Sequence, residues 1–376
     1  MVAVAVDVIM PARNAAATIG PAIASIRRQR FENWRLFIAD DGSTDQTGAI
    51  ALQAAGDDPR ISLISHDNMG IPATLNRLLG LGNAPFVARA DADDLSDPER
   101  FALQVARFSA EGEDLVCLAG WHDEIDAQGR GTGRRHCPSP IFSADPANAP
   151  AVEPPLIQPF AMMRRSTLDA VGGFRALPVS EDSDLYWRLM RHGRLAILDR
   201  VLGRYRMHAG SISGHSTRAL RIMAVCSQAA ALSAHRVGAG CADIDLAPLA
   251  RHRLEAAGEV EAMIAGLTGL NGAETRWMAI ATAAKLMELA GYRPAELAPA
   301  DCRFIGVTLR CGLDDLTPAN RRELARMTAA TAARLLRLGR PRDAAALADP
   351  ALWPQAMLRA ATGRLYWTKH LGAEAA

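Results

Sequence analysis

The sequence lacks the features that would place it in several large classes of protein. Its 376 residues contain no apolar stretch long enough to cross a membrane. The N-terminus goes straight into a strand-like run, without the charged region of a signal peptide. A formal net charge of +1 gives no reason to expect nucleic-acid binding. The sequence therefore predicts a cytoplasmic protein that does not bind nucleic acid.

Cysteine and lysine are also scarce. The six cysteines are scattered and form no Cys-x-x-Cys pair, so neither a zinc site nor a disulfide framework is indicated. Lys285 and Lys369 are the only lysines among 42 basic residues, a bias typical of a GC-rich bacterial genome. No Gly-x-Gly-x-x-Gly follows the first strand-like run, which argues against a dinucleotide fold of the dehydrogenase kind.

Strand-like and helix-like patterns alternate in the N-terminal part of the chain. Strands are expected at residues 2–10, 34–38 and 61–64 and from Phe86, and helices are expected from Ile19 and from Gly70-Ile71-Pro72. This spacing predicts an α/β fold with a mostly parallel sheet flanked by helices. In such a sheet a ligand binds beyond the carboxyl ends of the strands, which is where Pro11, Asp41 and Asp93 fall.

Two of these apolar runs stop abruptly in acids. One is followed by Asp40 and Asp41, and another by Asp91, Asp93 and Asp94. Acids at strand ends repel one another and lose hydration, so they are costly unless a cation or a hydrogen-bonding ligand is present. The pattern therefore predicts a metal-assisted nucleotide site.

A series of motifs then follows in a fixed order. The motifs are Val8-Ile-Met-Pro-x-x-Asn14, Asp40-Asp-Gly-Ser-Thr-Asp45, Asn68-x-Gly70 with Leu75-Asn76, Ala90-Asp-Ala-Asp-Asp94, Gly172-Gly-Phe174, Glu181-Asp-x-Asp-Leu-x-x-Arg188 and Tyr205-Arg-x-His208. Together they resemble the family 2 glycosyltransferases over about residues 3–214. The resemblance implies a Rossmann-like GT-A fold and inverting transfer of a sugar from a nucleotide diphosphate, with Mn or Mg as cofactor.

The resemblance implies a metal site made by Asp93 and Asp91, with His208 as a further metal ligand or a phosphate contact. Two acids that lie two residues apart in a turn can converge on a hard cation. Asp94 is instead expected to cap a helix that starts at Pro98. The alternative that all three acids are turn and cap residues stays open.

The resemblance also implies a set of donor contacts. Asp41 is expected to accept a hydrogen bond from the nucleotide base, which slightly favours a UDP-sugar. Arg13 stands where the family often has an aromatic residue, and an arginine can stack on a base or pair with a phosphate. The residues expected at the donor nucleotide are Pro11, Arg13, Asn14, Asp41, Arg77 and Asp91.

Asp182 matches the catalytic base of the family, which takes the proton from the acceptor hydroxyl. It lies at the expected start of an amphipathic helix, with Ser180 as the cap, and a helix start favours the ionised form. Trp121, Glu181 and Arg206 are candidates for sugar or acceptor contacts. Each has a structural alternative, as a core tryptophan, a first-turn acid and a counter-ion respectively.

The sequence predicts a GT-A catalytic domain at residues 1–218 and an all-helical domain at residues 219–376. A helix is expected from Thr317-Pro318 to Gly339, with an apolar stripe on one side. Its other side carries arginines, which either are solvated or rest on anionic lipid.

These observations predict a metal-dependent inverting glycosyltransferase that acts on a glycan or lipid-linked acceptor in bacterial surface polysaccharide synthesis, with peripheral contact at the inner face of the plasma membrane. One alternative is a nucleotidyltransferase, which usually has a Gly-rich basic loop after the first strand. Another is a binding or scaffolding protein that has lost turnover. Asp91, Asp93 and Asp182 argue against that second alternative, whereas Arg13 and Gln158 leave it open.

Overall fold

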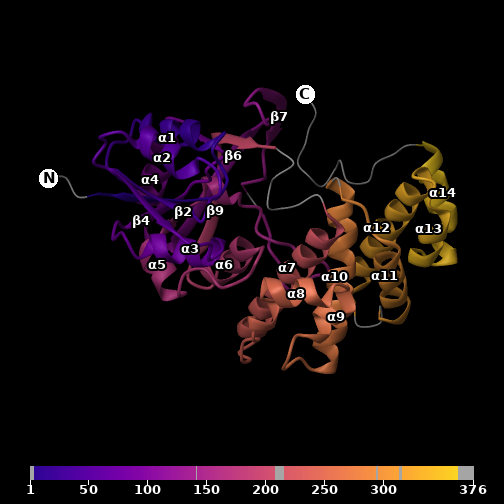
Figure 1. Ribbon diagram of the computed structural model, residues 1–376. Coiled ribbons are helices and arrows are strands. Elements are labelled where there is room, and N and C mark those ends of the chain that lie inside the picture. The colour runs from indigo at the N-terminus through magenta and orange to yellow at the C-terminus, as the bar shows by residue number, and fades with distance from the viewer. Residues whose placement is uncertain (1–3, 141, 208–215, 294, 313–315, 363–376) are drawn as a thin grey trace.

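A computed structural model describes residues 4–140, 142–207, 216–293, 295–312 and 316–362. The chain forms an α/β part and a helical part, which lie side by side (Figure 1). The N-terminal α/β part contains the predicted strands and helices, and the C-terminal part contains helices α7 to α14. The division into domains at residue 218 stays a prediction.

Within the described residues, nine strands form one mixed sheet in which parallel ladders hold most of the paired residues. The strand order is β3 (Ile61–His66), β2 (Trp34–Asp41), β1 (Val6–Ala12), β4 (Phe86–Arg89), β8 (Met162–Arg164), β6 (Leu115–Ile125), β9 (Arg194–Arg206) and β5 (Leu95–Ser96), and β7 (Gly131–His136) pairs with β6. Strands β1 to β4 are mutually parallel, so their carboxyl ends meet at one edge. The predicted fold class is confirmed.

The predicted strands end later than the sequence indicated. β1 continues through Pro11 to Ala12, because β2 still pairs with it at Asp40. β2 in turn reaches Asp41 because β3 pairs with it to that point. The first pair of acids therefore belongs to a strand rather than to a loop.

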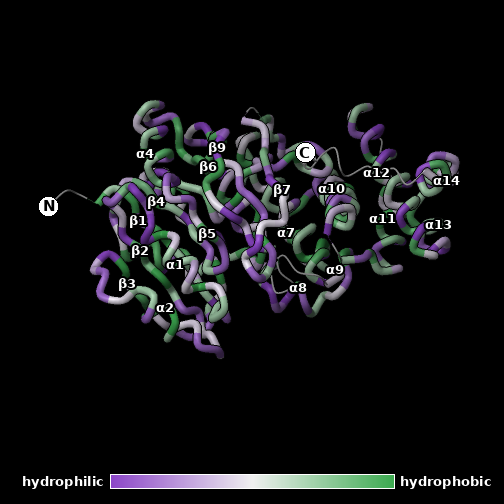
Figure 2. Tube along the Cα trace, turned by 90° about the horizontal axis from the view of Figure 1, so that it is seen from above, coloured by the Kyte–Doolittle hydropathy of each residue, from purple (hydrophilic) through white to green (hydrophobic). Residues whose placement is uncertain are grey.

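Helices cover both faces of this sheet (Figure 1). One face carries α1 (Ile19–Arg27), α2 (Thr47–Ala55) and α4 (Arg100–Glu111), and the other carries α3 (Ile71–Leu79), α5 (Arg165–Ala170) and α6 (Glu181–Leu189). The helix expected from Ile19 is α1, and its apolar residues Ile19, Ile23 and Ile26 are buried on one face. The hydrophobic strands run through the middle of this part (Figure 2).

The helical part has its own hydrophobic cluster. Its helices are α7 (Thr217–Gly238), α8 (Arg251–Ala257), α9 (Val260–Ala265), α10 (Gly272–Tyr292), α11 (Pro299–Cys311), α12 (Pro318–Arg337), α13 (Pro341–Leu347) and α14 (Trp353–Thr362). Short 3-10 helices lie at Gly112–Asp114, Gln158–Phe160, Ala247–Leu249 and Pro350–Leu352. Trp187 of α6 joins this cluster, while Leu185 of the same helix packs on the sheet. Helix α6 therefore connects the two parts.

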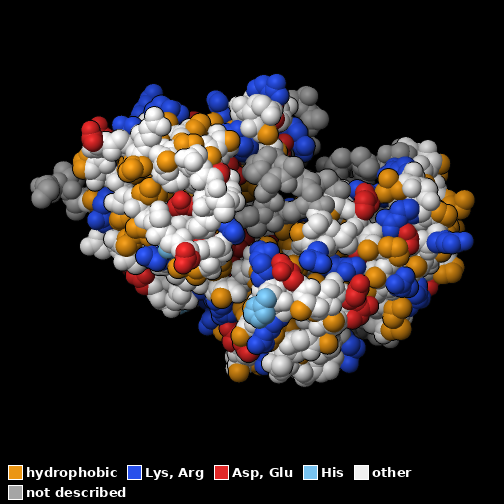
Figure 3. Space-filling view, in the orientation of Figure 1, with side chains coloured by type: hydrophobic (Ala, Val, Ile, Leu, Met, Phe, Trp, Pro, Cys, Tyr) orange, Lys and Arg blue, Asp and Glu red, His pale blue; other side chains and the backbone are white. Residues whose placement is uncertain are grey.

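Helix α12 confirms the predicted helix from Thr317-Pro318, and the Thr317 side chain accepts the Asn320 N–H at 3.1 Å. Its arginines differ in environment. Arg334 lies 2.6 Å from Glu296, whereas Arg321, Arg322, Arg326 and Arg337 are exposed. Positive and negative side chains are interspersed over the face of the helical part seen in Figure 3. No helix in the described ranges is both long and apolar enough to cross a membrane.

Candidate functional site

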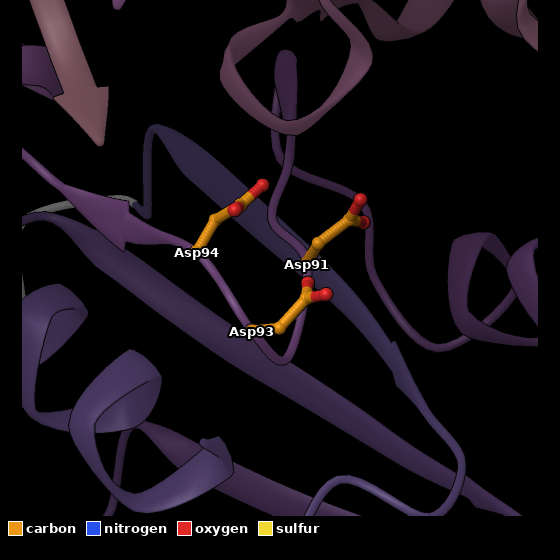
Figure 4. A group of neighbouring side chains, drawn as sticks. All are labelled: Asp91, Asp93 and Asp94. Carbon is orange, nitrogen blue, oxygen red and sulfur yellow. The ribbon is translucent and has the colours of Figure 1, made fainter. Parts of the chain in front are cut away.

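Three acids follow β4 in a single turn. One carboxylate oxygen from each of Asp91, Asp93 and Asp94 lies within 4.8 Å of the others. Their side chains extend from the turn toward the same side (Figure 4). They come together because β4 ends at Arg89 and the chain then enters β5, which pairs with β9. We call this group the carboxylate turn.

Asp94 does not cap a helix, so that prediction is wrong. Helix α4 begins at Arg100 rather than Pro98, and its N-cap residue is Glu99, whose side chain makes no capping hydrogen bond. Asp94 Oδ1 instead accepts the backbone N–H of Arg206 at 2.7 Å, which ties the end of β9 to the turn. Its Oδ2 is buried and has no hydrogen-bond partner among the described residues. Asp94 is therefore a third candidate ligand.

The carboxylate turn suits a hard divalent cation. Burial raises the pKa of Asp91 and raises that of Asp94 well above its ordinary value, and repulsion from Asp93 adds to both shifts. Arg89 Nη1, 2.6 Å from Asp91 Oδ1, opposes the shift of Asp91. A bound cation would favour the ionised form of all three acids. Because Mg²⁺ and Mn²⁺ prefer carboxylate oxygens, these residues fit such an ion.

Two buried arginines fix the shape of the turn. Arg100 is fully buried, and its Nη2 donates to the carbonyls of Arg89 at 2.7 Å and Ala161 at 3.1 Å. Burial lowers the pKa of Arg100 to about 9. On the other side, Arg206 Nε donates to the carbonyl of Asp93 at 2.7 Å, and its Nη1 reaches two carbonyls of the β6–β7 turn. The backbone of the carboxylate turn is thus held from both sides.

Glu181 and Asp182 form the first turn of α6. Burial raises the pKa of Asp182 to about 6. Burial also raises the pKa of Glu181 to about 7, with repulsion from Asp182 as the next cause. Arg89 acts in the opposite direction on both acids. The buried Arg89 thus pairs with the carboxylate turn, and its positive charge also favours the ionised form of both acids at the start of α6.

Ser180 occupies the N-cap position of α6, but the predicted side-chain cap is absent. Its backbone is left-handed, with φ of 61°, and Asp182 Oδ1 accepts the N–H of the next residue, Ser183, at 2.8 Å. The start of the helix acts as expected, because the backbone N–H groups of Asp182 and Ser183 lower the pKa of Asp182, but burial outweighs them and the net shift is upward. A carboxylate with a pKa near 6 is a stronger base than an ordinary aspartate and is still largely ionised at neutral pH.

The loop after β1 is tied to the loop after β2. The Asn14 backbone, with φ of 50°, donates its N–H to Ser43 Oγ at 3.0 Å, and Asn14 Oδ1 accepts the Thr44 N–H at 2.9 Å. Arg13 is exposed and lies against the side-chain amide of Asn68; with that amide flipped, its oxygen accepts Arg13 Nε at 3.0 Å. The structure therefore brings Arg13 and Asn14 to the strand edge where a nucleotide is expected.

Asp41 lies at the same edge but is only 4% exposed. Its two oxygens accept the backbone N–H groups of Met69 at 2.7 Å and Gly70 at 3.1 Å, which holds the start of α3. A contact with a nucleotide base would use the remaining lone pairs of this carboxylate. Arg77 is exposed in the last turn of α3, so it lies away from Asp41.

The other candidates are placed as follows. Trp121 on β6 is partly buried, and its Nε1 donates to the Pro138 carbonyl at 3.2 Å. Glu181 Oε1 accepts Gln158 Nε2 at 3.3 Å. The bonds of Arg206 described above go to backbone carbonyls. The proposed ligand His208 lies outside the described residues.

Sequence reasoning missed two residues near Asp182. Glu153 Oε2 accepts the hydroxyl of Ser183 at 2.6 Å, and Glu153 Oε1 lies 2.7 Å from Lys285 Nζ. The negative charge of Glu153 contributes to the raised pKa of Asp182. The rarity of lysine was a signal for Lys285, whereas the irregular segment around Glu153 offered none.

Comparison with known proteins gives consistent matches. The family model "Glycosyl transferase family 2" matches residues 7–172. "Putative glycosyltransferase EpsE" of Bacillus subtilis (strain 168) is 34% identical over 195 residues, which are 50% of this chain and 67% of EpsE. WfgD of Escherichia coli, named as a UDP-Glc:alpha-D-GlcNAc-diphosphoundecaprenol beta-1,3-glucosyltransferase, is 32% identical over 102 residues, 27% of this chain and 40% of WfgD.

The fold also resembles a solved structure, S. aureus TarS 1-349 in complex with UDP-GlcNAc. The TM-score is 0.50 at 17% identity, and the match covers 96% of this chain and 93% of that one. At this identity the likeness concerns the fold. It agrees with the expected GT-A sheet and extends into the helical part.

Proposed function

The chain belongs to glycosyltransferase family 2, and from that premise we propose that it transfers a sugar from a nucleotide diphosphate to an acceptor hydroxyl, with a divalent metal and with inversion at the anomeric carbon. One observation carries the proposal. One carboxylate oxygen from each of Asp91, Asp93 and Asp94 lies within 4.8 Å of the others, directly after β4 at the edge where the parallel strands end.

The carboxylate turn is the proposed metal site. Asp93 and Asp91 would hold Mn²⁺ or Mg²⁺, together with the unpartnered Asp94 oxygen, and His208 is a further proposed ligand. When bound, the cation supplies positive charge that stabilises the departing diphosphate. Arg206 and Arg100 hold the backbone of the turn through their hydrogen bonds to its carbonyls, and Arg206 is also proposed as an acceptor contact.

The donor nucleotide is proposed to lie against the loops after β1 and β2. Pro11, Arg13, Asn14 and Asp41 are the residues nearest that edge. A UDP-sugar is favoured, which the name of WfgD supports. Arg77 remains a prediction from the sequence alone, since it lies at the far end of α3.

Asp182 is the proposed base. It accepts the proton of the acceptor hydroxyl while that oxygen forms a bond to the anomeric carbon and the bond to the nucleoside diphosphate breaks. Glu181 shares the site and, with a pKa of about 7, is partly protonated at neutral pH. It is therefore proposed as an acceptor contact, as is Trp121.

The proposed acceptor is a glycan or a lipid-linked saccharide of bacterial surface polysaccharide synthesis. The name of WfgD, which specifies a diphosphoundecaprenol acceptor, supports this class. The enzyme would act at the inner face of the plasma membrane, and the exposed arginines of α12 are the proposed contact with anionic lipid. We also propose that residues 1–218 form the catalytic domain and residues 219–376 a helical domain.

The test is a thermal-shift screen of nucleoside diphosphates and their sugar conjugates, with and without Mn²⁺, because a ligand that binds only the folded state raises the melting temperature. Donors that bind are then assayed for sugar transfer. The expected result is a metal-dependent shift with uridine compounds that is lost in Asp93→Ala. The absence of any donor-dependent shift would overturn the proposal.

A further inference from the structure

We infer that Glu153 and Lys285 are positioning residues for Asp182, so that the helical part of the chain holds the base of the α/β part in place. This inference rests on the proposed role of Asp182. Neither residue is assigned a contact with donor or acceptor. They act instead through Ser183, the residue that follows the base.

A continuous series of contacts joins helix α10 to the base. Lys285 Nζ lies 2.7 Å from Glu153 Oε1. The second oxygen of Glu153, Oε2, accepts the Ser183 hydroxyl at 2.6 Å. The backbone N–H of Ser183 in turn donates to Asp182 Oδ1 at 2.8 Å. Movement of Lys285 or Glu153 would therefore displace the first turn of α6.

Lys285 and Glu153 are largely shielded from water, so each charge is stabilised mainly by the other. Lys285 is 8% exposed as a residue, and the Glu153 side chain is 18% exposed. Burial would raise the pKa of Glu153, but Lys285 and the Ser183 hydroxyl outweigh burial and hold that pKa below its ordinary value. Removing one partner of a buried ion pair leaves an uncompensated charge, which is far more costly than losing a surface pair.

The first turn of α6 needs such an external contact. Its N-cap residue Ser180 makes no side-chain bond and has a left-handed backbone. The turn also holds the adjacent acids Glu181 and Asp182, which repel each other. Further along, Trp187 of the same helix packs into the hydrophobic cluster of the helical part. One polar series of contacts, through Glu153 to Lys285, and one apolar contact, through Trp187, therefore link α6 to that part.

The choice of lysine at residue 285 supports a specific role. Arginine supplies every basic residue of the chain apart from Lys285 and Lys369. Lys285 Nζ meets two carboxylates, Glu153 at 2.7 Å and Glu288 at 3.1 Å. A compact ammonium with three donors can serve both acids in a narrow space, whereas a planar guanidinium is larger and has a fixed fork geometry.

Charged and titratable groups from three elements surround Asp182. Glu181 and Tyr186 belong to α6 itself, Arg89 comes from β4, and Glu153 comes from the segment before the Gln158–Phe160 turn. Among these groups of the described chain, Glu153 brings negative charge from outside α6. Neutralising Glu153 should therefore make Asp182 easier to ionise.

The central test is Glu153→Gln in the full chain, because glutamine keeps the size and the acceptor for Ser183 but removes the charge. The acid limb of the pH profile of kcat should move to lower pH by roughly 0.5–1 unit. Glu288→Gln is the matched control: it removes the other carboxylate of Lys285 and should leave the acid limb in place. A purely structural role for Glu153 would lower kcat without moving that limb.

Lys285→Met should reduce kcat about 10- to 100-fold through misplacement of the base, with the donor KM within about twofold of wild type. Lys285→Arg keeps the positive charge but replaces the compact ammonium with a larger guanidinium. Its kcat should therefore lie between those of Lys285→Met and the wild type. Melting temperatures are measured for each variant. If Lys285→Met does not fold, Glu153→Gln and Lys285→Arg decide the question.

A second readout does not need turnover. Aspartate labelled with ¹³C at the carboxyl carbon gives an NMR titration in which the Asp182 signal is assigned by its loss in Asp182→Asn. That titration should move to lower pH in Glu153→Gln at constant metal concentration.

If the wild type transfers sugar but neither the acid limb nor this titration moves, the inference is overturned and the proposed function stands. If the titration moves in a protein that transfers no sugar, the proposed function fails while the action of Glu153 on Asp182 stands.

Discussion

The carboxylate turn after β4 and the first turn of α6 both hold acids whose pKa values are raised by burial, but they differ in how those acids are partnered. In the carboxylate turn the three acids converge within 4.8 Å, and one Asp94 oxygen has no hydrogen-bond partner among the described residues. In α6, Asp182 is bonded to Ser183 and lies near ionised Glu153. The first arrangement fits the proposed cation site, and the second fits the proposed base. Neighbours, rather than residue type, separate the two roles.

The largest effect is expected for Asp182→Asn. Asparagine cannot take the acceptor proton, so transfer should fall about 10²- to 10⁴-fold, while donor binding stays near wild type because the carboxylate turn is untouched. Single-turnover transfer and donor titration measure the two quantities. If Asp182→Asn lost as much donor affinity as it lost transfer, the proposed separation of roles between Asp182 and the carboxylate turn would be wrong.

Asp93→Ala should reduce both donor affinity in Mn²⁺ and transfer, each by about tenfold or more, because a metal ligand acts on the bound diphosphate and on the departing one. Calorimetric titration of the donor with and without Mn²⁺ checks the first quantity. Asp67→Ala is the control, since Asp67 is an exposed acid outside the turn. A metal-dependent affinity that survives in Asp93→Ala would contradict the proposed metal site.

The pH dependence of kcat/KM should distinguish the base from an ordinary aspartate. The base acts when deprotonated, and its raised pKa of about 6 means that the rate falls as the pH drops below about 6. An unperturbed aspartate would place that limb near its ordinary pKa of 3.8. Rate profiles between pH 4.5 and 8, with donor and metal saturating, measure the position of the limb. A flat profile down to pH 5 would exclude Asp182 as the titrating base.

The smallest effect is expected for Asp94→Asn without metal. The pKa of Asp94 is higher in the folded than in the unfolded protein. The ionised Asp94 therefore lowers the free energy of unfolding at neutral pH. This loss of stability disappears once the pH is low enough to protonate Asp94 in both states. With a chelator present, the variant should be more stable than wild type by about 1 kcal/mol at pH 7, and the difference should shrink toward pH 4. Urea unfolding measures it. Added Mn²⁺ should favour the wild type instead, and equal responses would argue against Asp94 as a ligand.

The parts of the fold that depend on local pattern were predictable. The stripe of Ile19, Ile23 and Ile26 gives α1, and the start at Thr317-Pro318 gives α12. The strand ends were less predictable, because β1 and β2 extend only as far as their neighbours pair with them. Hydrophobic periodicity carries no information about where a distant strand stops.

The same limit applies to the site. The spacing of Asp91 and Asp93 was enough to predict that they converge. The partner of Asp94 is the backbone of Arg206, which is 112 residues away in sequence, so a local cap was the wrong expectation. The partner of Glu153 is Lys285, on a helix of the other part of the chain. Contacts of this kind arise only when the chain has folded.

Lys285 is buried and is one of only two lysines in the chain. Chemical labelling of its amine can therefore report local opening of the structure around it. Amine-selective reagents modify a lysine only when its amine is exposed and deprotonated, and the ion pairs with Glu153 and Glu288 oppose both conditions. The rate at which the peptide containing Lys285 acquires an amine label would therefore report how often α10 separates from the segment that carries Glu153. Followed by mass spectrometry at rising urea concentration, this labelling would show whether that separation precedes global unfolding.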